Sequence, residues 1–230
     1  MKICGLMKTT LLDFPGHIAA TIFTGSCQFR CPFCQNSALI PNSVLAEYTE
    51  EEILAFLKKR SGILEGVAIT GGEPTLQPDL QSFIRKVRAL GFLVKLDTNG
   101  YRPDVLKHLC EEKLLDYVAM DIKSCPDRYR IVSGVPNLNL EPIFESISFL
   151  KQNTVPFEFR TTLVKELHTA ADMEEIGKWL AGDFQYFLQN YKDSDQVLTS
   201  GLHGFTKEEL LTFASILKPY IPNVNLRGID

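Results

Sequence analysis

Three cysteines lie within eight consecutive residues, 27–34, which read Cys-Gln-Phe-Arg-Cys-Pro-Phe-Cys. Thiolates at Cys27, Cys31 and Cys34 can reach one compact metal centre from a single short loop. Structural zinc wants four protein ligands, and no second Cys pair or His pair follows at a suitable spacing. A [4Fe–4S] cluster normally takes four thiolates, so three leave one iron open to a small molecule. The pattern favours such a cluster. A structural zinc loop, or an electron-transfer cluster with Cys125 as a distant fourth ligand, stays open.

The other three of the six cysteines are scattered along the chain, at Cys4, Cys110 and Cys125. Isolated cysteines of this kind usually behave as small buried hydrophobes, and we expect no chemical role for them. The chain shows no signal-peptide pattern and no long apolar run, so we expect a cytoplasmic protein without a membrane span. Its net charge of −4 gives no basic surface for nucleic acid.

Short apolar runs rich in β-formers alternate with amphipathic helical runs, which is typical of parallel β/α units. Thr49 with Glu52, and Thr206 with Glu209, form capping boxes at two helix starts. About six β/α units are too few for a closed eight-fold barrel. We therefore expect an α/β fold, an open partial (β/α)6 TIM-like barrel, in a single domain of residues 1–230. The predicted strands are Ala19–Thr24, Val67–Thr70, Leu93–Asp97, Tyr117–Asp121, Phe157–Leu163, Tyr186–Gln189 and Val224–Leu226.

The carboxyl ends of barrel strands usually carry the chemistry, and four of these ends hold polar residues. Residues 70–74 read Thr-Gly-Gly-Glu-Pro, residues 97–100 read Asp-Thr-Asn-Gly and residues 119–123 read Ala-Met-Asp-Ile-Lys. Arg160 lies inside an otherwise apolar strand, where it needs an anionic or hydrogen-bonding partner. Taken alone, the first two segments are ordinary turns, the third is an Asp–Lys salt bridge and Arg160 reaches solvent. The residues themselves leave these alternatives open.

With the cysteine triplet, these segments resemble the radical S-adenosylmethionine (SAM) superfamily, whose hallmark is C-x₃-C-x-aromatic-C after the first barrel strand. The resemblance implies a [4Fe–4S] cluster whose open iron chelates the amino and carboxylate groups of SAM. Reductive cleavage then yields a 5′-deoxyadenosyl radical, which takes a hydrogen atom from the substrate. Such a reaction needs no general base, so we expect His17 and His168 to be structural or exposed.

The resemblance also implies residue roles. Beyond the cluster ligands Cys27, Cys31 and Cys34, the implied cofactor-binding residues are Phe33, Gly71, Gly72, Glu73, Thr98, Asn99, Asp121, Lys123 and Arg160. Asp97, Thr98, Ala119 (through its carbonyl) and Asp121 would hold a monovalent cation beside the SAM carboxylate. Gln189 and Asn190, at the end of the sixth predicted strand, could touch adenine.

Within the superfamily, the chain is most similar to the glycyl-radical-enzyme activating enzymes, and among these to the longer-form activating proteins of anaerobic ribonucleoside-triphosphate reductase. The segments that carry this resemblance are residues 12–16, 70–77, 94–100 and 117–123. It implies abstraction of a glycine Cα hydrogen from a partner glycyl radical enzyme, with flavodoxin or ferredoxin as electron donor. Asp13 precedes the first predicted strand, where such activators touch the glycine loop. Two rivals are a radical SAM enzyme acting on a small molecule, such as a deazapurine-forming ring contraction, and a non-enzymatic iron–sulfur or zinc protein.

Overall fold

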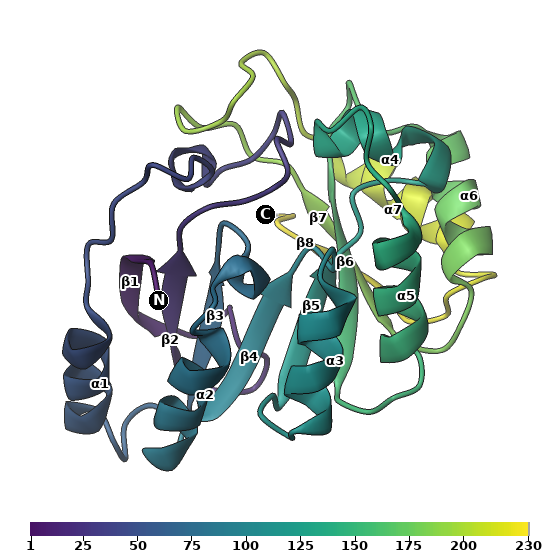
Figure 1. The fold of residues 1–230 in the computed structure, drawn as a ribbon. Coiled ribbons are helices and arrows are strands. Elements are labelled where there is room, and N and C mark those ends of the chain that lie inside the picture. The colour runs from purple at the N-terminus through teal and green to yellow at the C-terminus, as the bar shows by residue number, and fades with distance from the viewer. Residues whose placement is uncertain (230) are drawn as a thin grey trace. The chain divides into compact units, whose positions relative to one another are not determined.

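The computed structural model describes residues 1–229 and divides into two compact units (Figure 1). The first unit comprises Met1–Gln28, Ala38–Ala119 and Pro142–Pro156. The second comprises Phe29–Ser37, Met120–Glu141 and the chain from Phe157 onward. Strand β5 (Tyr117–Asp121) crosses the division, since its first three residues belong to the first unit and its last two to the second.

The sheet of the first unit begins with an antiparallel pair, β1 (Ile3–Thr10) and β2 (Ala19–Thr24). Strand β3 (Gly66–Gly71) pairs in parallel with β2, and β4 (Leu93–Thr98) pairs in parallel with β3. The register aligns Thr24 at the end of β2 with Gly71 at the end of β3. Loops that follow β2 and β3 therefore leave the sheet at the same edge.

Helices connect these strands and carry the expected start signals. Helix α1 (Glu50–Lys59) has the complete Thr49–Glu52 capping box. Helix α2 (Leu80–Ala89) buries an apolar face and packs against β4. The unit also holds α3 (Pro103–Glu111), the short 3₁₀ turn η2 (Pro74–Leu76), and most of α5 (Glu141–Leu150) and of the 3₁₀ turn η1 (Ser37–Leu39).

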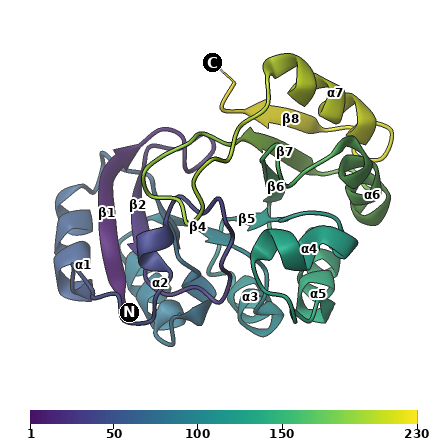
Figure 2. The ribbon, with the colours of Figure 1, turned by 90° about the horizontal axis from the view of Figure 1, so that it is seen from above.

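The second unit is built on three parallel strands, β6 (Phe157–Leu163), β7 (Gln185–Asn190) and β8 (Val224–Arg227). Helix α6 (Ala170–Leu180) packs against α7 (Lys207–Leu217), and α7 lies alongside β7 and β8 (Figure 2). Helix α4 (Pro126–Ser133) completes the unit. Capping boxes open α7, as predicted, and α6, where Asp172 takes the place of the usual Glu or Gln.

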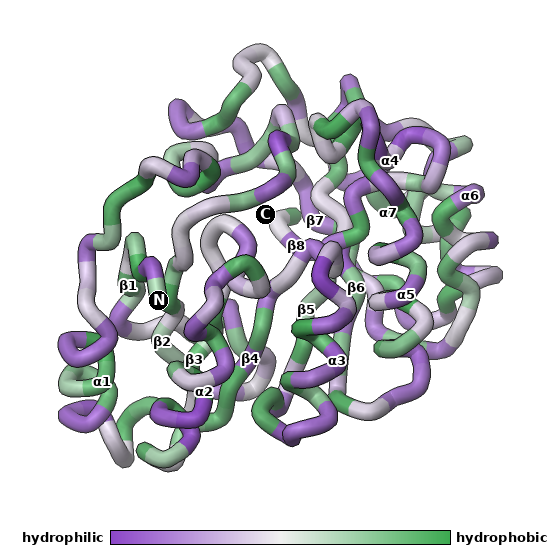
Figure 3. The backbone as a smooth tube through the Cα atoms, viewed as in Figure 1, coloured by the Kyte–Doolittle hydropathy of each residue, from purple (hydrophilic) through white to green (hydrophobic). Residues whose placement is uncertain are grey.

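The strands are rich in buried apolar residues, and hydrophobic residues recur along β2 and β4 in Figure 3. All seven predicted strands are present, and three of them have the predicted bounds. The sequence analysis missed β1 and α4. Residues Met7–Thr9 of β1 are exposed, so this antiparallel strand lacks the continuous apolar run of the others. Among residues 1–229, no helix is long and apolar enough to cross a membrane.

Candidate functional site

In the first unit, the chain leaves β2 through a short turn that presents Cys27. The backbone amides of Ser26 and Cys27 donate to the carbonyls of Leu39 and Ile40, at 2.7 and 3.2 Å. The Cys27 thiol is half-buried, and the side-chain amide of Asn99 lies 3.9 Å from its sulfur. A donor beside a thiolate stabilises it and tunes the potential of a bound cluster.

The two glycines after β3 let two loops approach each other closely. A Cβ on Gly71, whose φ is +114°, would lie 2.4 Å from the backbone nitrogen of Thr24. A Cβ on Gly72 would lie 2.2 Å from the carbonyl oxygen of Ser26. The amide of Glu73 donates to the same carbonyl at 2.7 Å. Only glycines allow the backbone after β3 to lie directly against the turn that carries Cys27.

Glu73 is fully buried, and its carboxylate joins the Gly-Gly-Glu turn to the end of β4. Its oxygens accept hydrogen bonds from the backbone and hydroxyl of Thr75, at 3.1 and 2.5 Å. They also accept from the Thr98 hydroxyl at 2.7 Å and the Asn99 amide at 2.8 Å. Burial raises the pKa of Glu73 in spite of these donors. A cationic ammonium group would therefore be favoured beside it.

The structure thus brings Glu73, Thr98 and Asn99, three of the expected cofactor-binding residues, together in the first unit and links them to Cys27. Gln28 extends the link by donating its side-chain amide to Asn99 Oδ1 at 2.9 Å. Asp97 lies beside them in sequence, and its carboxylate forms an ion pair with the ammonium of Lys95, two residues earlier on β4. Sequence analysis gave Lys95 no role.

In the second unit, Cys31 and Cys34 share one turn, closed by a hydrogen bond from the Cys34 amide to the Cys31 carbonyl at 3.0 Å. The preceding Arg30 amide donates to Ser133 at the end of α4, at 2.9 Å. Gly134 follows with φ +69°, and a Cβ there would lie 2.1 Å from the Arg30 carbonyl. Helix α4, which was not predicted, therefore supports the cysteine loop.

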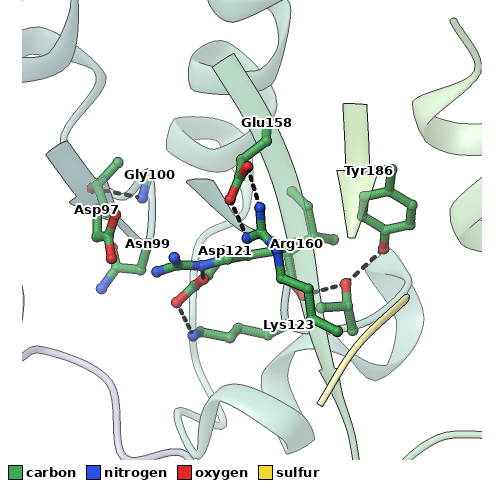
Figure 4. A network of polar contacts seen from close by, with 12 residues as sticks. Asp97, Asn99, Gly100, Asp121, Lys123, Glu158, Arg160 and Tyr186 are labelled. Carbon is green, nitrogen blue, oxygen red and sulfur yellow. Dashed lines mark hydrogen bonds and ion pairs between the residues drawn. The ribbon is translucent and has the colours of Figure 1, made fainter. Parts of the chain in front are cut away.

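The end of β5 brings together three residues that the sequence predicted (Figure 4). Lys123 Nζ contacts Asp121 Oδ2 at 2.9 Å, and the Arg160 guanidinium donates to Asp121 Oδ1. Burial alone would raise the pKa of Asp121, but the charges of Arg160 and Lys123 outweigh it and hold that pKa far below its usual value. Burial alone would lower the pKa of Lys123, but the neighbouring Asp121 carboxylate outweighs this effect and keeps the Lys123 pKa raised. All three groups are ionised at neutral pH, with a net charge of +1 suited to an anionic ligand.

Three further side chains hold the backbone of this segment, and sequence reasoning missed their positions. The hydroxyls of Tyr129 and Thr161 donate to the carbonyls of residues 121 and 122, at 3.4 and 2.7 Å. The Nε2 of His168 donates to the carbonyl of Lys123 at 2.8 Å. The ring of Phe33, next to Cys34, packs edge-on against His168 with centroids 6.5 Å apart. No local signal marks these contacts, because the partners lie up to 45 residues apart.

The segment Lys192–Gly204 has no helix or strand and packs against the loop that carries Cys31 and Cys34. The Thr199 amide donates to the Pro32 carbonyl at 3.0 Å, and the Gln35 side chain donates to the Lys192 carbonyl at 2.7 Å. Asn190 holds the base of this segment by exchanging two hydrogen bonds of 2.9 Å with the Phe205 backbone. Its amide is thereby engaged in anchoring the loop.

The remaining predicted positions lie as follows. Asp13 lies in the connection between β1 and β2 and accepts a 2.5 Å hydrogen bond from Thr21. Ala119 is buried within β5, and Gln189 is half-buried near the end of β7. His168 is buried and structural, as expected.

Comparison with known proteins decides the family. The model of the radical SAM superfamily matches residues 21–180. The chain belongs to the radical SAM superfamily. Membership implies a [4Fe–4S] cluster and SAM as cofactors, and it makes the protein a radical SAM enzyme. It also confirms the predicted fold class, since a radical SAM methyltransferase from Sphaerobacter thermophilus aligns over 93% of this chain and 67% of its own. The TM-score is 0.72 at 18% identity.

Two relatives are informative. The chain is 32% identical to a protein of Methanocaldococcus jannaschii that bears the name of a glycyl-radical enzyme activating enzyme, over 99% of this chain and 96% of the relative. It is 31% identical to a 7-carboxy-7-deazaguanine synthase of Neisseria meningitidis, over 48% of this chain and 46% of the relative. The first match spans both proteins, and the second is confined to about half of each.

The thiols of this radical SAM enzyme are of the chemical type that binds an iron–sulfur cluster. None of the six cysteines forms a disulfide within residues 1–229. Burial raises the pKa of Cys31 to about 11, so a thiolate there needs a positive centre, which iron supplies. The ionised Asp121–Lys123–Arg160 group of the second unit suits an anionic part of a ligand such as SAM.

The same residues do not fit a monovalent cation. Asp97 is already paired with the ammonium of Lys95, and Asp121 with both Lys123 and Arg160. A cation added at either carboxylate would lie beside the positively charged side chain that already pairs with it, and the two positive charges would repel each other.

Proposed function

We propose that the protein is an activating enzyme that abstracts a Cα hydrogen from a glycine of a partner glycyl radical enzyme. The observation that carries this proposal is the match to the Methanocaldococcus relative, which leaves almost no part of either chain unaligned. Anaerobic ribonucleoside-triphosphate reductase is the partner that the sequence resemblance favours. The donor would be a flavodoxin or a ferredoxin, and the protein would act in the cytoplasm.

We assign Cys27, Cys31 and Cys34 as the ligands of three irons of the cluster. The open iron would take SAM, whose ammonium group would face Glu73 and the two glycines before it. This role is supported by the buried carboxylate of Glu73, which accepts hydrogen bonds from the neutral donors of Thr75, Thr98 and Asn99. The family match runs across both compact units, in support of residues 1–230 acting as one radical SAM domain.

Lys123 and Arg160 would face the anionic parts of SAM, and Asp121 would keep both side chains in place. Phe33 would shield the cluster, and Thr98 and Asn99 would hold Glu73 and the Cys27 thiolate. When bound, the cluster and SAM supply a 5′-deoxyadenosyl radical that accepts a hydrogen atom from the substrate. The chain's own contribution is to orient SAM, exclude water and admit the glycine.

The test is an anaerobic incubation of reconstituted, reduced protein with SAM and the ribonucleotide reductase from the same source. We expect a glycyl-radical EPR signal on the reductase. With Cα-deuterated glycine in the reductase, deuterium should appear in 5′-deoxyadenosine. A reductase whose reactive glycine is replaced by alanine is the control, and it should give neither result. SAM cleavage without deuterium transfer from any glycyl radical enzyme would overturn the proposal.

A second candidate is a small-molecule reaction such as a deazapurine-forming ring contraction. The deazaguanine synthase match supports it, but that match covers about half of each protein. Incubation with the ring-contraction substrate in place of the reductase distinguishes the two. Product formation there, without a radical on any partner, would favour this candidate.

A further inference from the structure

Lys95 is an ammonium group buried in the middle of a strand. Its side chain is 2% exposed, and it lies on β4 in register with Ala68 of β3. The flanking residues Val94 and Leu96 are fully buried on the opposite face. A lysine in such a position is costly unless its charge is paired. Packing alone therefore does not explain why a lysine occupies this position.

The partner of this cation is Asp97. Residues two apart on a strand point to the same side, and the Lys95 ammonium contacts Oδ1 of the Asp97 carboxylate. Asp97 immediately precedes Thr98 and Asn99, which bind Glu73 and approach Cys27. The ion pair thus lies at the base of the SAM-binding turn of the first unit.

The pairing satisfies the charge of Asp97 from within the chain. A free monovalent ion was predicted for this carboxylate, together with Thr98, Ala119 and Asp121. Asp121 is likewise neutralised by tethered cations, Lys123 and Arg160. Each carboxylate expected to bind the ion is therefore bound by a positively charged side chain of its own unit.

We propose that the Lys95 ammonium acts as a built-in counter-ion for Asp97, so that the enzyme binds SAM without sodium or potassium. The inference rests on the proposed roles of Thr98 and Asn99, which follow Asp97 in the chain. It makes Lys95 a positioning residue: its charge fixes the Asp97 carboxylate and, through it, the Asp-Thr-Asn turn. Removal of Lys95 would create a cation site that the native protein lacks.

The experiment compares reconstituted wild type, Lys95→Met and Lys95→Arg, with Lys58→Met as a control on the exposed face of α1. SAM affinity is measured in tetramethylammonium chloride and in potassium or sodium chloride of equal ionic strength. Wild type, Lys95→Arg and Lys58→Met should bind SAM equally in all three salts. Lys95→Met should lose about tenfold in tetramethylammonium, the scale of one charged hydrogen bond. Potassium or sodium should restore most of that loss.

A second readout needs neither cluster nor activity. The unfolding temperature of cluster-free Lys95→Met should rise with potassium but not with tetramethylammonium, whereas that of wild type should respond equally to both. Thallium(I), followed by its NMR line, should bind Lys95→Met and not wild type. If Lys95→Met does not fold, the wild-type measurements still decide. A several-fold gain in wild-type SAM affinity with potassium or sodium, or thallium binding to wild type, overturns the proposal.

These outcomes are separable from failure of the proposed function. A wild type that binds and cleaves SAM without added cation, but generates no radical on any partner, would refute the activating role and leave the Lys95 assignment intact. A wild type that activates the reductase only with potassium or sodium would support the activating role and overturn the Lys95 assignment.

Discussion

The imidazole of His168 donates a hydrogen bond to the backbone carbonyl of Lys123, 45 residues away in sequence, at 2.8 Å. Its other nitrogen, Nδ1, accepts the amide of Val164 at 3.1 Å, which fixes the tautomer with the proton on Nε2. The ring is buried and packs against Phe33 of the cysteine loop. One neutral histidine therefore fixes the backbone from which Lys123 projects and contacts the loop that carries Cys31 and Cys34.

Replacement of His168 by phenylalanine should remove the hydrogen bonds that its ring makes with Lys123 and Val164. It keeps a ring of similar size but leaves the Lys123 carbonyl and the Val164 amide without their partner, at a cost of about 2–3 kcal/mol in the free energy of unfolding. SAM affinity should fall because Lys123 loses its fixed position. Urea unfolding and a SAM titration measure the two effects. His203→Gln, at an exposed histidine, is the control and should change neither.

The same variant should change how stability depends on pH. Burial lowers the pKa of His168 below its ordinary value of 6.5. The unfolded chain then takes up a proton before the folded protein does, so the stability supplied by neutral His168 is present above pH 6.5 and is lost as the pH falls. The difference in unfolding free energy between wild type and His168→Phe should shrink between about pH 7 and pH 5. A constant difference would contradict the neutral, hydrogen-bonded assignment.

Gly72→Ala should impair SAM binding through a backbone clash. The added Cβ would lie 2.2 Å from the Ser26 carbonyl oxygen, which cannot move without displacing the turn before Cys27. We expect a stability loss of about 1–3 kcal/mol together with weak SAM binding and incomplete cluster incorporation. Gly62→Ala is the matched control: its φ is +79°, but nothing lies within 4 Å of the new Cβ. It should lose stability only. Normal SAM affinity in Gly72→Ala would show that the close approach is not needed.

The sequence predicted the buried parallel strands well because both of their faces are covered. The bounds of β2, β5 and β6 match the predicted ranges. Among the described strands, β1 pairs only with β2, and its residues Met7–Thr9 are exposed. It therefore lacks the continuous apolar run by which the other strands were predicted, and it was missed. Its omission made β2 look like the first strand.

The residues of the candidate site likewise divide into those that could be predicted from the sequence and those that could not. Motif residues such as Glu73 and Asp121 could be found from their positions at strand ends. Their supporting residues could not, because Tyr129, Thr161 and His168 meet the Asp-Ile-Lys backbone only through the tertiary fold. Lys95 could have been noticed as a charged residue inside an apolar strand, but its partner is evident only from the contact with Asp97.

Serine variants of the six cysteines should fall into two classes when their iron content is measured. Serine at Cys27, Cys31 or Cys34 removes a proposed ligand, and anaerobic reconstitution should then yield little cluster absorbance and no SAM cleavage. Serine at Cys4, Cys110 or Cys125 should leave both nearly unchanged. Cys110 illustrates the reason, because it is buried on the apolar face of α3 together with Leu106 and Leu109. Loss of the cluster in Cys125→Ser would instead indicate a fourth cysteine ligand and contradict the open iron.

The last prediction concerns the C-terminal strand. Arg227 on β8 makes two hydrogen bonds, of 2.6 and 2.8 Å, to the fully buried carboxylate of Glu158 on β6, and its guanidinium stacks 3.4 Å above the Phe187 ring of β7. One side chain thus ties three parallel strands together. Arg227→Met should remove both of these hydrogen bonds from the buried Glu158 carboxylate and cost about 2–4 kcal/mol, less than for a fully buried pair because the Arg227 side chain is 30% exposed.

The double variant Glu158→Met, Arg227→Met tests this reason. A buried ion pair replaced on both sides by apolar groups often loses little stability, so the double variant should recover most of the loss seen in Arg227→Met. Urea unfolding of the two single variants and the double variant measures the coupling between the two positions. Because Glu158 lies on β6 two residues before Arg160, Arg227→Met should also weaken SAM binding, and the double variant should restore it. If the double variant is as unstable as Arg227→Met, the stack on Phe187 rather than the buried carboxylate is the source of the effect.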